Sequence, residues 1–414
     1  MKATVSKITN SFVILFMASL IHINAQAQVS AQGDIGVNVN YKKSIQAIDL
    51  AGRELFFEKV PQRIILGDSR YIYALSILNK DQPLSNIVGM VNSLKDVNFG
   101  SYQQYQKKFP EIDDIHQVGH TSADSFSIET TLSLNADLAI FGVDGHGPNS
   151  RNRQLIDQLE KAGVQVVFID FRNDPIVNTV KSIALLGAIL DRQQQAEEFT
   201  VFYQEQLNIV TDRLDKIQSM STDTKDGAKA RPNVFLHSRV GLEDLCCETM
   251  VRGMMATLLE QVKGVNVAKE RIPGSAGVLN LEYLLIHQPD IYIATAISSK
   301  SAVQYEDQHN IPPYITLGAG ITEKEAQQSF IRALKHVGVS ELDAIKSKRA
   351  YAIWHSFYNS PLNIVAVQVF AKWLYPQTFS DLQPRKTMEK LFERFQSTPL
   401  EGTYWLALGQ KVNR

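Results

Sequence analysis

The chain has 414 residues, of which 44% are hydrophobic and 21% are charged, and its formal net charge is −1. This composition is that of an ordinary globular protein, and the length suits two or three domains. A charge this small argues against nucleic acid or an anionic membrane surface as a partner.

Residues 1–27 have the pattern of a cleavable secretion signal. Lys2 and Lys7 precede an apolar run at 12–23, and Ala25-Gln26-Ala27 fits an A-x-A cleavage site. Cleavage would remove two lysines and no acid, which changes the net charge to −3. The apolar run is short for a membrane span, no later run replaces it, and no cysteine follows it to carry a lipid anchor. We therefore expect a soluble periplasmic protein.

Residues 28–174 are predicted to form an N-terminal α/β lobe. After a leading segment with a hairpin near 49–53, the first core strand, 63–66, ends at Gly67-Asp68-Ser69 and is followed by a helix over 71–78. A second strand follows at 87–90. Further strand and helix patterns alternate through the rest of the lobe, which predicts a mostly parallel sheet with helices on its faces.

The segment 175–220 has apolar residues at helical spacing and almost no glycine or proline. It predicts one long helix, or two nearly collinear ones, that joins two lobes. An exposed linker follows at 221–232, then a C-terminal α/β lobe at 233–374 and a helical tail at 375–414. A rigid connector predicts small hinge motion on binding.

Residues 128–140 and 281–293 carry the same pattern 153 positions apart. In both, a glutamate stands three residues before a leucine, eight before an aspartate and eleven before an isoleucine. This is the layout of a short helix that leads into a buried strand. A repeat at this period indicates two similar lobes, and the segments after the repeat strands are expected at the rim of a cleft between them.

The two cysteines are adjacent, at Cys246 and Cys247. In an oxidising compartment they form a vicinal disulfide, remain two free thiols, or are a coincidence of small buried side chains; we favour the disulfide. They follow a predicted strand at 233–237, where a cleft loop is expected.

Several motifs together resemble the substrate-binding proteins of iron-siderophore, haem and cobalamin ABC importers. They cover about residues 60–375 and are Pro61-Gln62-Arg63-Ile64-Ile65 with Ala74-Leu75, Glu129 through Asp137, Gly264-Val265-Asn266-Val267-Ala268, and Glu282 through Asp290. The resemblance implies two Rossmann-like lobes bridged by a long helix and a shallow cleft for a bulky metal complex. It also implies a membrane permease as partner and a monomeric carrier.

One departure from that family concerns charge. The family usually has a glutamate in the first helix of each lobe, which docks on arginines of the permease, whereas the aligned positions here are Arg70 and Arg252. Both arginines face either acidic sockets of a permease or an anionic ligand. An alignment shift of one turn would instead give Glu248 and Glu260 the docking role.

A ferric siderophore is large and often anionic, so arginines and aromatic faces at strand ends are the candidate ligand-binding groups. The candidates are Arg70, Tyr71, Tyr102, His120, Arg239, Cys246, Cys247, Arg252, His355 and Tyr358. Haem is the main alternative ligand, because His120, His146, Tyr102, His355 or Tyr358 could supply an axial ligand to its iron.

Other function classes have little support in the sequence. The histidines are scattered, so we predict no dedicated metal site and no resident cofactor. No nucleophile elbow, phosphate-binding loop or zinc hydrolase motif is present, and we therefore expect no catalytic residues and no enzyme. The matched Glu129 and Glu282 are assigned a structural role such as helix capping. A binding module that signals to a receptor remains an alternative.

Overall fold

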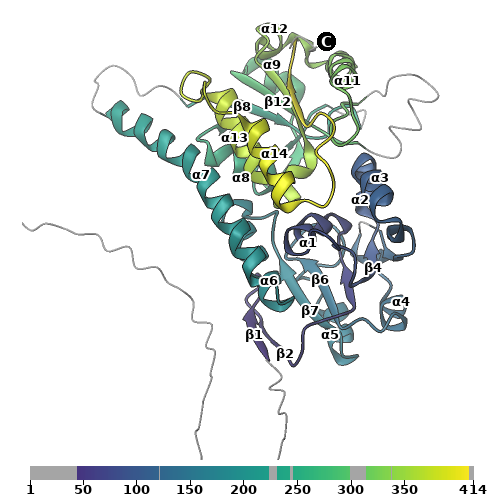
Figure 1. Cartoon of the computed structure of the whole chain (residues 1–414). Coiled ribbons are helices and arrows are strands. Elements are labelled where there is room, and N and C mark those ends of the chain that lie inside the picture. Colours follow the sequence, from purple (N-terminus) through teal and green to yellow (C-terminus); the bar gives the residue numbers. More distant parts are fainter. Residues whose placement is uncertain are drawn as a thin grey trace, which may run out of the picture.

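Two α/β lobes are stacked one on the other, with the long helix α7 running along both (Figure 1). This computed structural model describes residues 44–120, 122–222, 231–242, 246–298, 314–336 and 338–409. The predicted signal peptide and most of the predicted linker lie outside these residues. The predicted fold class, two α/β lobes with a helical connection, is confirmed.

The sheet of the N-terminal lobe has five strands, all parallel, in the order β5-β4-β3-β6-β7. Most of their residues are buried, as expected where helices cover both faces of a parallel sheet. The strands are β3 (Ile64–Leu66), β4 (Ile87–Val91), β5 (His116–Gly119), β6 (Leu138–Gly142) and β7 (Gln165–Ile169).

Short helices and a leading hairpin complete this lobe. The hairpin expected near 49–53 is present as the antiparallel pair β1 and β2. Asp49 stabilises its turn by accepting hydrogen bonds from the backbone amides of Ala51 and Arg53. The elements are β1 (Ile45–Ile48), β2 (Glu54–Phe57), α1 (Ile72–Leu78), α2 (Ser93–Val97), α3 (Phe99–Lys108), α4 (Ile128–Ser133) and α5 (Arg153–Lys161).

The connection between the lobes consists of two helices, α6 (Pro175–Ile189) and α7 (Gln193–Thr222). Helix α6 begins at Pro175, where Asp174 caps the free amide of Val177. The two helices meet so closely that a methyl group on Gly187 would lie 2.5 Å from the Cβ of Ala196. Helix α7 then packs on both α1 and α13 (Asn363–Leu374), which joins the lobes.

The sheet of the C-terminal lobe is mixed instead of purely parallel. Its main path is β11-β9-β8-β12-β13-β14, with β10 also paired to β8. Strands β8, β10, β12 and β13 are parallel to one another, and β9, β11 and β14 are antiparallel to their neighbours. The strands are β8 (Asn233–His237), β9 (Glu248–Met250), β10 (Val265–Asn266), β11 (Ala276–Val278), β12 (Ile291–Ala296), β13 (Ala350–Trp354) and β14 (Trp405–Ala407).

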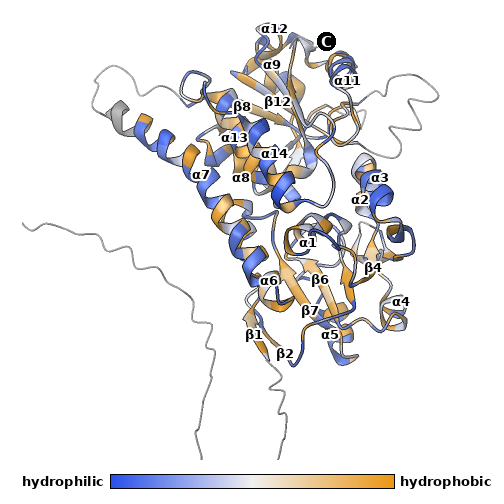
Figure 2. Cartoon of the chain, in the orientation of Figure 1, coloured by the Kyte–Doolittle hydropathy of each residue, from blue (hydrophilic) through white to orange (hydrophobic). Residues whose placement is uncertain are grey.

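The tail predicted as helical also contributes this last strand, because β14 closes one edge of the sheet against β13. Figure 2 shows that hydrophobic residues concentrate in the strands and that helix α7 alternates polar and apolar faces. The other helices of this lobe and its tail are α8 (Met254–Gln261), α9 (Leu281–Ile286), α11 (Glu323–His336), α12 (Asp343–Lys346) and α14 (Pro384–Phe395).

The sequence repeat corresponds to a structural one. Helix α4 leads into β6 and helix α9 leads into β12, and each of these strands lies in the interior of its sheet. Asp137 accepts hydrogen bonds from the amides of Gln62 and Arg63, just before β3, and Asp290 accepts one from the amide of Asn233 at the start of β8. Each aspartate therefore ties its own strand to the parallel neighbour.

The glutamates of the repeat do not cap these helices. Ser127 and Asn280 do so, each accepting a hydrogen bond from an amide in the first turn. Glu129 and Glu282 lie within that first turn, where a negative charge favours the helix dipole. Among the described residues, no helix is both long enough and apolar enough to span a bilayer.

Candidate functional site

The two sheets reverse their strand order at matching places. In the N-terminal lobe the chain passes from β3 to β4 and β5 on one side and then from β6 to β7 on the other side. In the C-terminal lobe β8 and β12 are the corresponding pair, with β9 on one side and β13 on the other. Ligands of open α/β sheets bind where the carboxyl ends of such strand pairs diverge. The segments that follow these four strands contain many of the polar residues described below.

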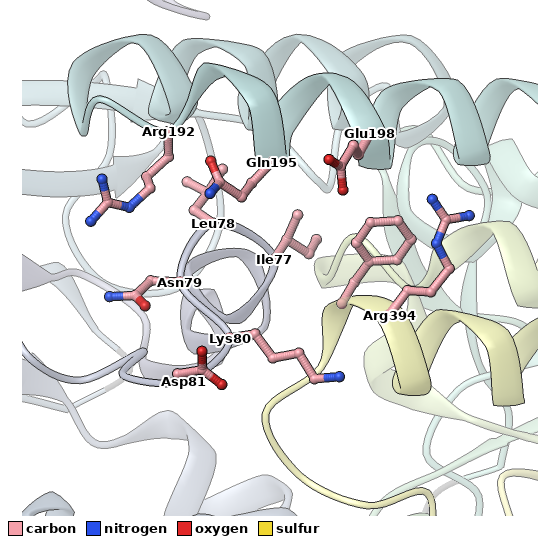
Figure 3. Close-up of a pocket in the computed structure, with 10 residues that line it drawn as sticks. Ile77, Leu78, Asn79, Lys80, Asp81, Arg192, Gln195, Glu198 and Arg394 are labelled. Atoms are coloured by element: carbon pink, nitrogen blue, oxygen red, sulfur yellow. The ribbon is translucent and has the colours of Figure 1, made fainter.

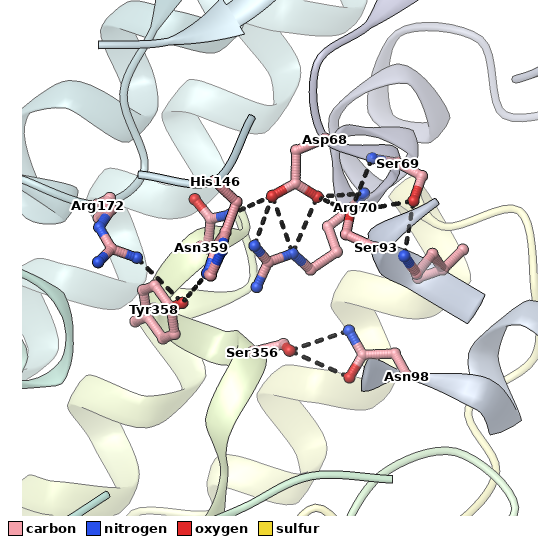
Figure 4. Close-up of polar contacts among 11 residues, drawn as sticks. Asp68, Ser69, Arg70, Ser93, Asn98, His146, Arg172, Ser356, Tyr358 and Asn359 are labelled. Carbon is pink, nitrogen blue, oxygen red and sulfur yellow. Dashed lines mark hydrogen bonds and ion pairs between the residues drawn. The ribbon is translucent and has the colours of Figure 1, made fainter. Parts of the chain in front are cut away.

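A buried ion pair follows β3. The guanidinium Nε of Arg70 donates to both oxygens of Asp68, at 2.9 and 3.1 Å, and the two side chains are only 2% and 1% exposed (Figure 4). Asp68 also accepts hydrogen bonds from Ser93 in its own lobe and from Asn359 in the other, the latter at 3.0 Å. The carboxylate therefore links the two lobes.

The pKa of Asp68 reflects these partners. Burial alone would raise it, but the charge and hydrogen bonds of Arg70 dominate in combination with His146 and Ser93, and lower the pKa to about 2. Burial likewise opposes the charge on Arg70, yet Asp68 and Tyr358 raise its pKa. Both groups are charged at neutral pH.

Tyr358, which follows β13, is the centre of a second group of contacts between the lobes. Its hydroxyl accepts a hydrogen bond from Nη1 of Arg172 at 3.2 Å and lies 3.4 Å from Nε2 of His146. The guanidinium carbons of Arg172 and Arg70 lie 5.4 and 5.9 Å from the centre of its ring, in cation–π geometry. Gly145 makes room for this arrangement, because a Cβ there would lie 2.9 Å from Cδ of Arg172.

Positive charge dominates around Tyr358. In the part of the chain that the structure describes, Arg172 has no carboxylate within ion-pair distance, in contrast to Arg70. Burial, followed by the charge of Arg70, lowers the pKa of His146 to about 4, so this imidazole is neutral at pH 7. The group can attract an anion, and the N–H of the neutral imidazole and the O–H of Tyr358 can donate hydrogen bonds to it.

Arg239 and His355 extend this group in the C-terminal lobe. The hydroxyl of Thr295, near the end of β12, accepts a hydrogen bond from the amide of Arg239 and lies 2.9 Å from Nδ1 of His355. The guanidinium of Arg239 donates to both oxygens of Glu248, at 2.8 and 2.9 Å. Burial, then Arg239 and Arg70, hold the pKa of His355 well below its usual value.

Further hydrogen bonds connect the two lobes. Asn98, between α2 and α3, accepts hydrogen bonds from the indole nitrogen of Trp354 and from the hydroxyl of Ser356. The amide of Phe99 donates to the carbonyl of Ser298 at 2.7 Å. In this arrangement the lobes are in direct contact, with Arg70 and Tyr358 each only 2% exposed.

The predicted ligand-binding residues thus fall into two sets. Arg70 and Tyr358 lie between the lobes, and His355 and Arg239 lie near them in the C-terminal lobe, where the ring centre of His355 is 4.8 Å from that of Tyr358. The others lie elsewhere, each in a different environment.

Tyr71 and Tyr102 are buried within the N-terminal lobe. Tyr71 packs against Phe171 with ring centres 6.1 Å apart, and Tyr102 donates its hydroxyl to Asp113. His120 is exposed and lies beside Gln117. These three side chains therefore do not belong to the group around Tyr358.

Arg252 is exposed but engaged with its own lobe. Its guanidinium donates to the carbonyls of Ile272 and Gly274, at 2.8 and 2.7 Å, and so fastens the loop before β11. Of the two alternative docking residues, Glu248 is held by Arg239 and Glu260 pairs with Lys269. Cys246 and Cys247 form the expected vicinal disulfide.

Sequence reasoning missed Asp68, Arg172, Asn98 and Asn359 as site residues. Arg172 had the same signal as Arg70, since it stands just after the strand β7, as Arg70 does after β3. His146 was considered only as a haem ligand. The asparagines gave no signal, because their partners are more than 250 positions away in the sequence.

A separate surface pocket of about 320 Å³ lies at the junction of α1, α7 and α14 (Figure 3). Its lining mixes opposite charges, including Lys80, Asp81, Arg192, Glu198 and Arg394. None of these residues contacts the group between the lobes, so we do not assign the ligand to this pocket.

No protein-family model matches the sequence, and no curated protein does so either. Solved structures do match. A TroA-like periplasmic binding protein, FepB, from Veillonella parvula has a TM-score of 0.74 at 21% identity, covering 88% of this chain and 100% of that one.

Two further structures extend the comparison. The molybdate periplasmic binding protein MolA of a Haemophilus influenzae ABC transporter has a TM-score of 0.61 at 17% identity, covering 86% of this chain and 99% of that one. A periplasmic heme binding protein from Pseudomonas aeruginosa has a TM-score of 0.50 at 16% identity, covering 77% and 94%. The resemblance expected from the sequence is therefore confirmed at the level of structure, and the chain has the two-lobed fold of TroA-like periplasmic binding proteins.

Proposed function

We propose that this chain is the periplasmic solute-binding protein of an ABC importer and that it carries an anionic iron complex, a ferric siderophore, between its lobes. The observation that carries the proposal is Arg172, a guanidinium that lies between the lobes without a carboxylate partner among the described residues. Arg70 and Arg239 add positive charge nearby, although carboxylates already balance both. Carboxylate or catecholate oxygens of a siderophore would pair with such arginines.

The burial of the site bears on how a ligand enters. Arg70 and Tyr358 are almost fully buried, whereas Arg172 and His146 are only partly buried. A bulky complex would first meet the partly exposed pair, and the lobes would have to separate before it reached Tyr358. The burial of Arg70 also favours a role toward the ligand over a role in docking to a permease.

Haem is the second candidate, and a specific observation supports it. The hydroxyl of Tyr358 and Nε2 of His146 lie 3.4 Å apart, and either could approach a haem iron. Haem propionates would then use the same arginines. Delivery to an inner-membrane permease by a monomeric carrier, without chemistry on the ligand, completes the proposal.

The test is a titration of the chain with ferric siderophores, iron-free siderophores and hemin, in which quenching of tryptophan fluorescence reports binding. We expect saturable quenching by one ferric siderophore class. A charged hydrogen bond contributes about 1.5–3 kcal/mol, so Arg172→Gln should weaken binding by about 10–100-fold. Arg153→Gln, on the exposed face of α5, is the matched control and should leave binding unchanged.

Binding of hemin alone, with a shifted Soret band, would replace the siderophore by haem. Equal affinities of the Arg172→Gln and Arg153→Gln variants would contradict the assignment of Arg172 to the ligand. Hydrolysis or another conversion of the ligand would contradict the proposal of a simple carrier.

A further inference from the structure

One cluster of metal-ligating side chains lies outside the group around Tyr358. A ring nitrogen of His237 and the sulfur atoms of Cys246 and Cys247 all lie within 4.8 Å of one another. His237 ends β8, and the two cysteines precede β9, which pairs with β8 at His237. The pairing of two neighbouring strands therefore brings these three side chains together.

In the oxidised chain the two sulfur atoms are bonded to each other and are poor ligands. Metal binding requires thiolates. From this geometry we infer that reduction of the Cys246–Cys247 disulfide creates a binding site for one thiophilic d10 cation, such as Zn²⁺ or Cd²⁺, with His237 as the third ligand.

The surroundings of His237 suit a metal ligand. Its Nδ1 lies 2.6 Å from the hydroxyl of Tyr292, a buried residue of the neighbouring strand β12. When Nδ1 carries the proton and donates to that oxygen, Nε2 has a free lone pair, which is the usual arrangement of metal-bound histidines.

The two cysteines differ in their exposure. Cys247 is fully buried, whereas Cys246 is partly exposed and offers the sulfur that an external reductant can attack. A dithiol donor would supply two electrons and two protons, break the bond between the sulfur atoms and itself become a disulfide. A divalent cation then displaces the two thiol protons, so that each metal bound releases two protons.

The site is distinct from the proposed anion site but close to it in sequence. Glu248, which follows Cys247, holds the guanidinium of Arg239. The metal site does not depend on the identity of the imported ligand, and it can be tested without that ligand.

The experiment uses Cd²⁺ as the probe and the whole chain as the protein. One sample stays oxidised, and another is reduced with a phosphine, which becomes phosphine oxide with oxygen from water as the disulfide becomes two thiols. The phosphine is removed without air, and both samples are titrated while the thiolate-to-cadmium absorption band is recorded. Because the chain has only two cysteines, any such band reports this pair.

We expect the reduced chain to bind one Cd²⁺ with the charge-transfer band and the oxidised chain to show none. His237→Gln should weaken binding, and Tyr292→Phe, which removes the partner of Nδ1, should do so by about 10–100-fold. His120→Gln, which changes an exposed histidine outside the cluster, should bind like the unaltered chain.

Two results would overturn the inference. One is a reduced chain that binds no more Cd²⁺ than the oxidised chain does. The other is unchanged affinity in both the His237→Gln and the Tyr292→Phe variants, because the cation would then be held by thiolates alone. Thermal unfolding of the oxidised variants tests whether each is folded. If His237→Gln does not fold, Tyr292→Phe still tests the role of the histidine.

Discussion

The buried pair of Asp68 and Arg70 can be tested by removing each charge separately and then both. Asp68→Asn keeps the size of the side chain but leaves the guanidinium of Arg70 buried, at 2% exposure, without an anionic partner. Arg70→Met removes the cation and keeps much of the apolar stem. The double variant removes both charges.

The structure sets the expected size of the effect. The pKa of Asp68 is about 2 instead of 3.8, which corresponds to about 2 kcal/mol in favour of its charged form. Breaking a buried pair by removing one partner typically costs roughly 3–5 kcal/mol. We therefore expect Asp68→Asn to lower the free energy of unfolding by about 2–4 kcal/mol, and the double variant to lose less than the sum of the two single variants.

The assay is urea unfolding followed by tryptophan fluorescence, since Trp354 is buried next to Asn98 between the lobes. The control is Asp144→Asn, which breaks the exposed pair of Asp144 with Arg151 and should cost about 1 kcal/mol or less. If Asp68→Asn costs no more than this control, or if the double variant loses the full sum, the reasoning about a buried, coupled pair is wrong.

Two other predictions concern acid stability and helix packing. Burial lowers the folded-state pKa of His237 to about 3 from 6.5, so below pH 6.5 the unfolded chain binds more protons than the folded chain, and the free energy of unfolding should decrease toward pH 3. Unfolding midpoints measured across this pH range should fall less steeply for His237→Gln than for the unaltered chain. Equal slopes would contradict the assignment of this pH dependence to His237. Alanine is favoured over glycine in helices by about 1 kcal/mol, but Gly187→Ala should destabilise the chain by about 1–3 kcal/mol because the new methyl group would lie 2.5 Å from the Cβ of Ala196. Thermal unfolding should show that adding Ala196→Gly partly restores the stability. A Gly187→Ala variant that is more stable than the unaltered chain would rule out the close contact.

Local patterns were sufficient for much of the fold. The runs that became β3, β6, β8 and β12 are apolar and short, and their length together with the polar or glycine residues that follow them indicates buried strands. The repeat predicted two similar lobes. Its aspartates have the same role in each lobe, since each accepts a backbone hydrogen bond near the start of the neighbouring strand. The hairpin turn at Asp49 followed from equally local chemistry.

Local patterns could not determine how distant segments meet. The sequence predicted one long helix or two nearly collinear ones, and the structure has two, α6 and α7, which meet at Gly187 and Ala196. It predicted a helical tail, whereas β14 adds an edge strand to a sheet whose other strands precede it by 50 residues or more. In both cases the deciding contacts are tertiary and leave no period in the chain.

The same division holds for the site. Arg70, Arg239, His355 and Tyr358 were predictable because residues just after parallel strands gather at one edge of a sheet. Only the tertiary structure decided that Arg70 is neutralised by Asp68 whereas Arg172 has no carboxylate partner among the described residues, since charge balance depends on which side chains face each other. The amino-acid sequence thus determined where polar residues stand along each strand, and the packing of one lobe on the other determined which of them can act together.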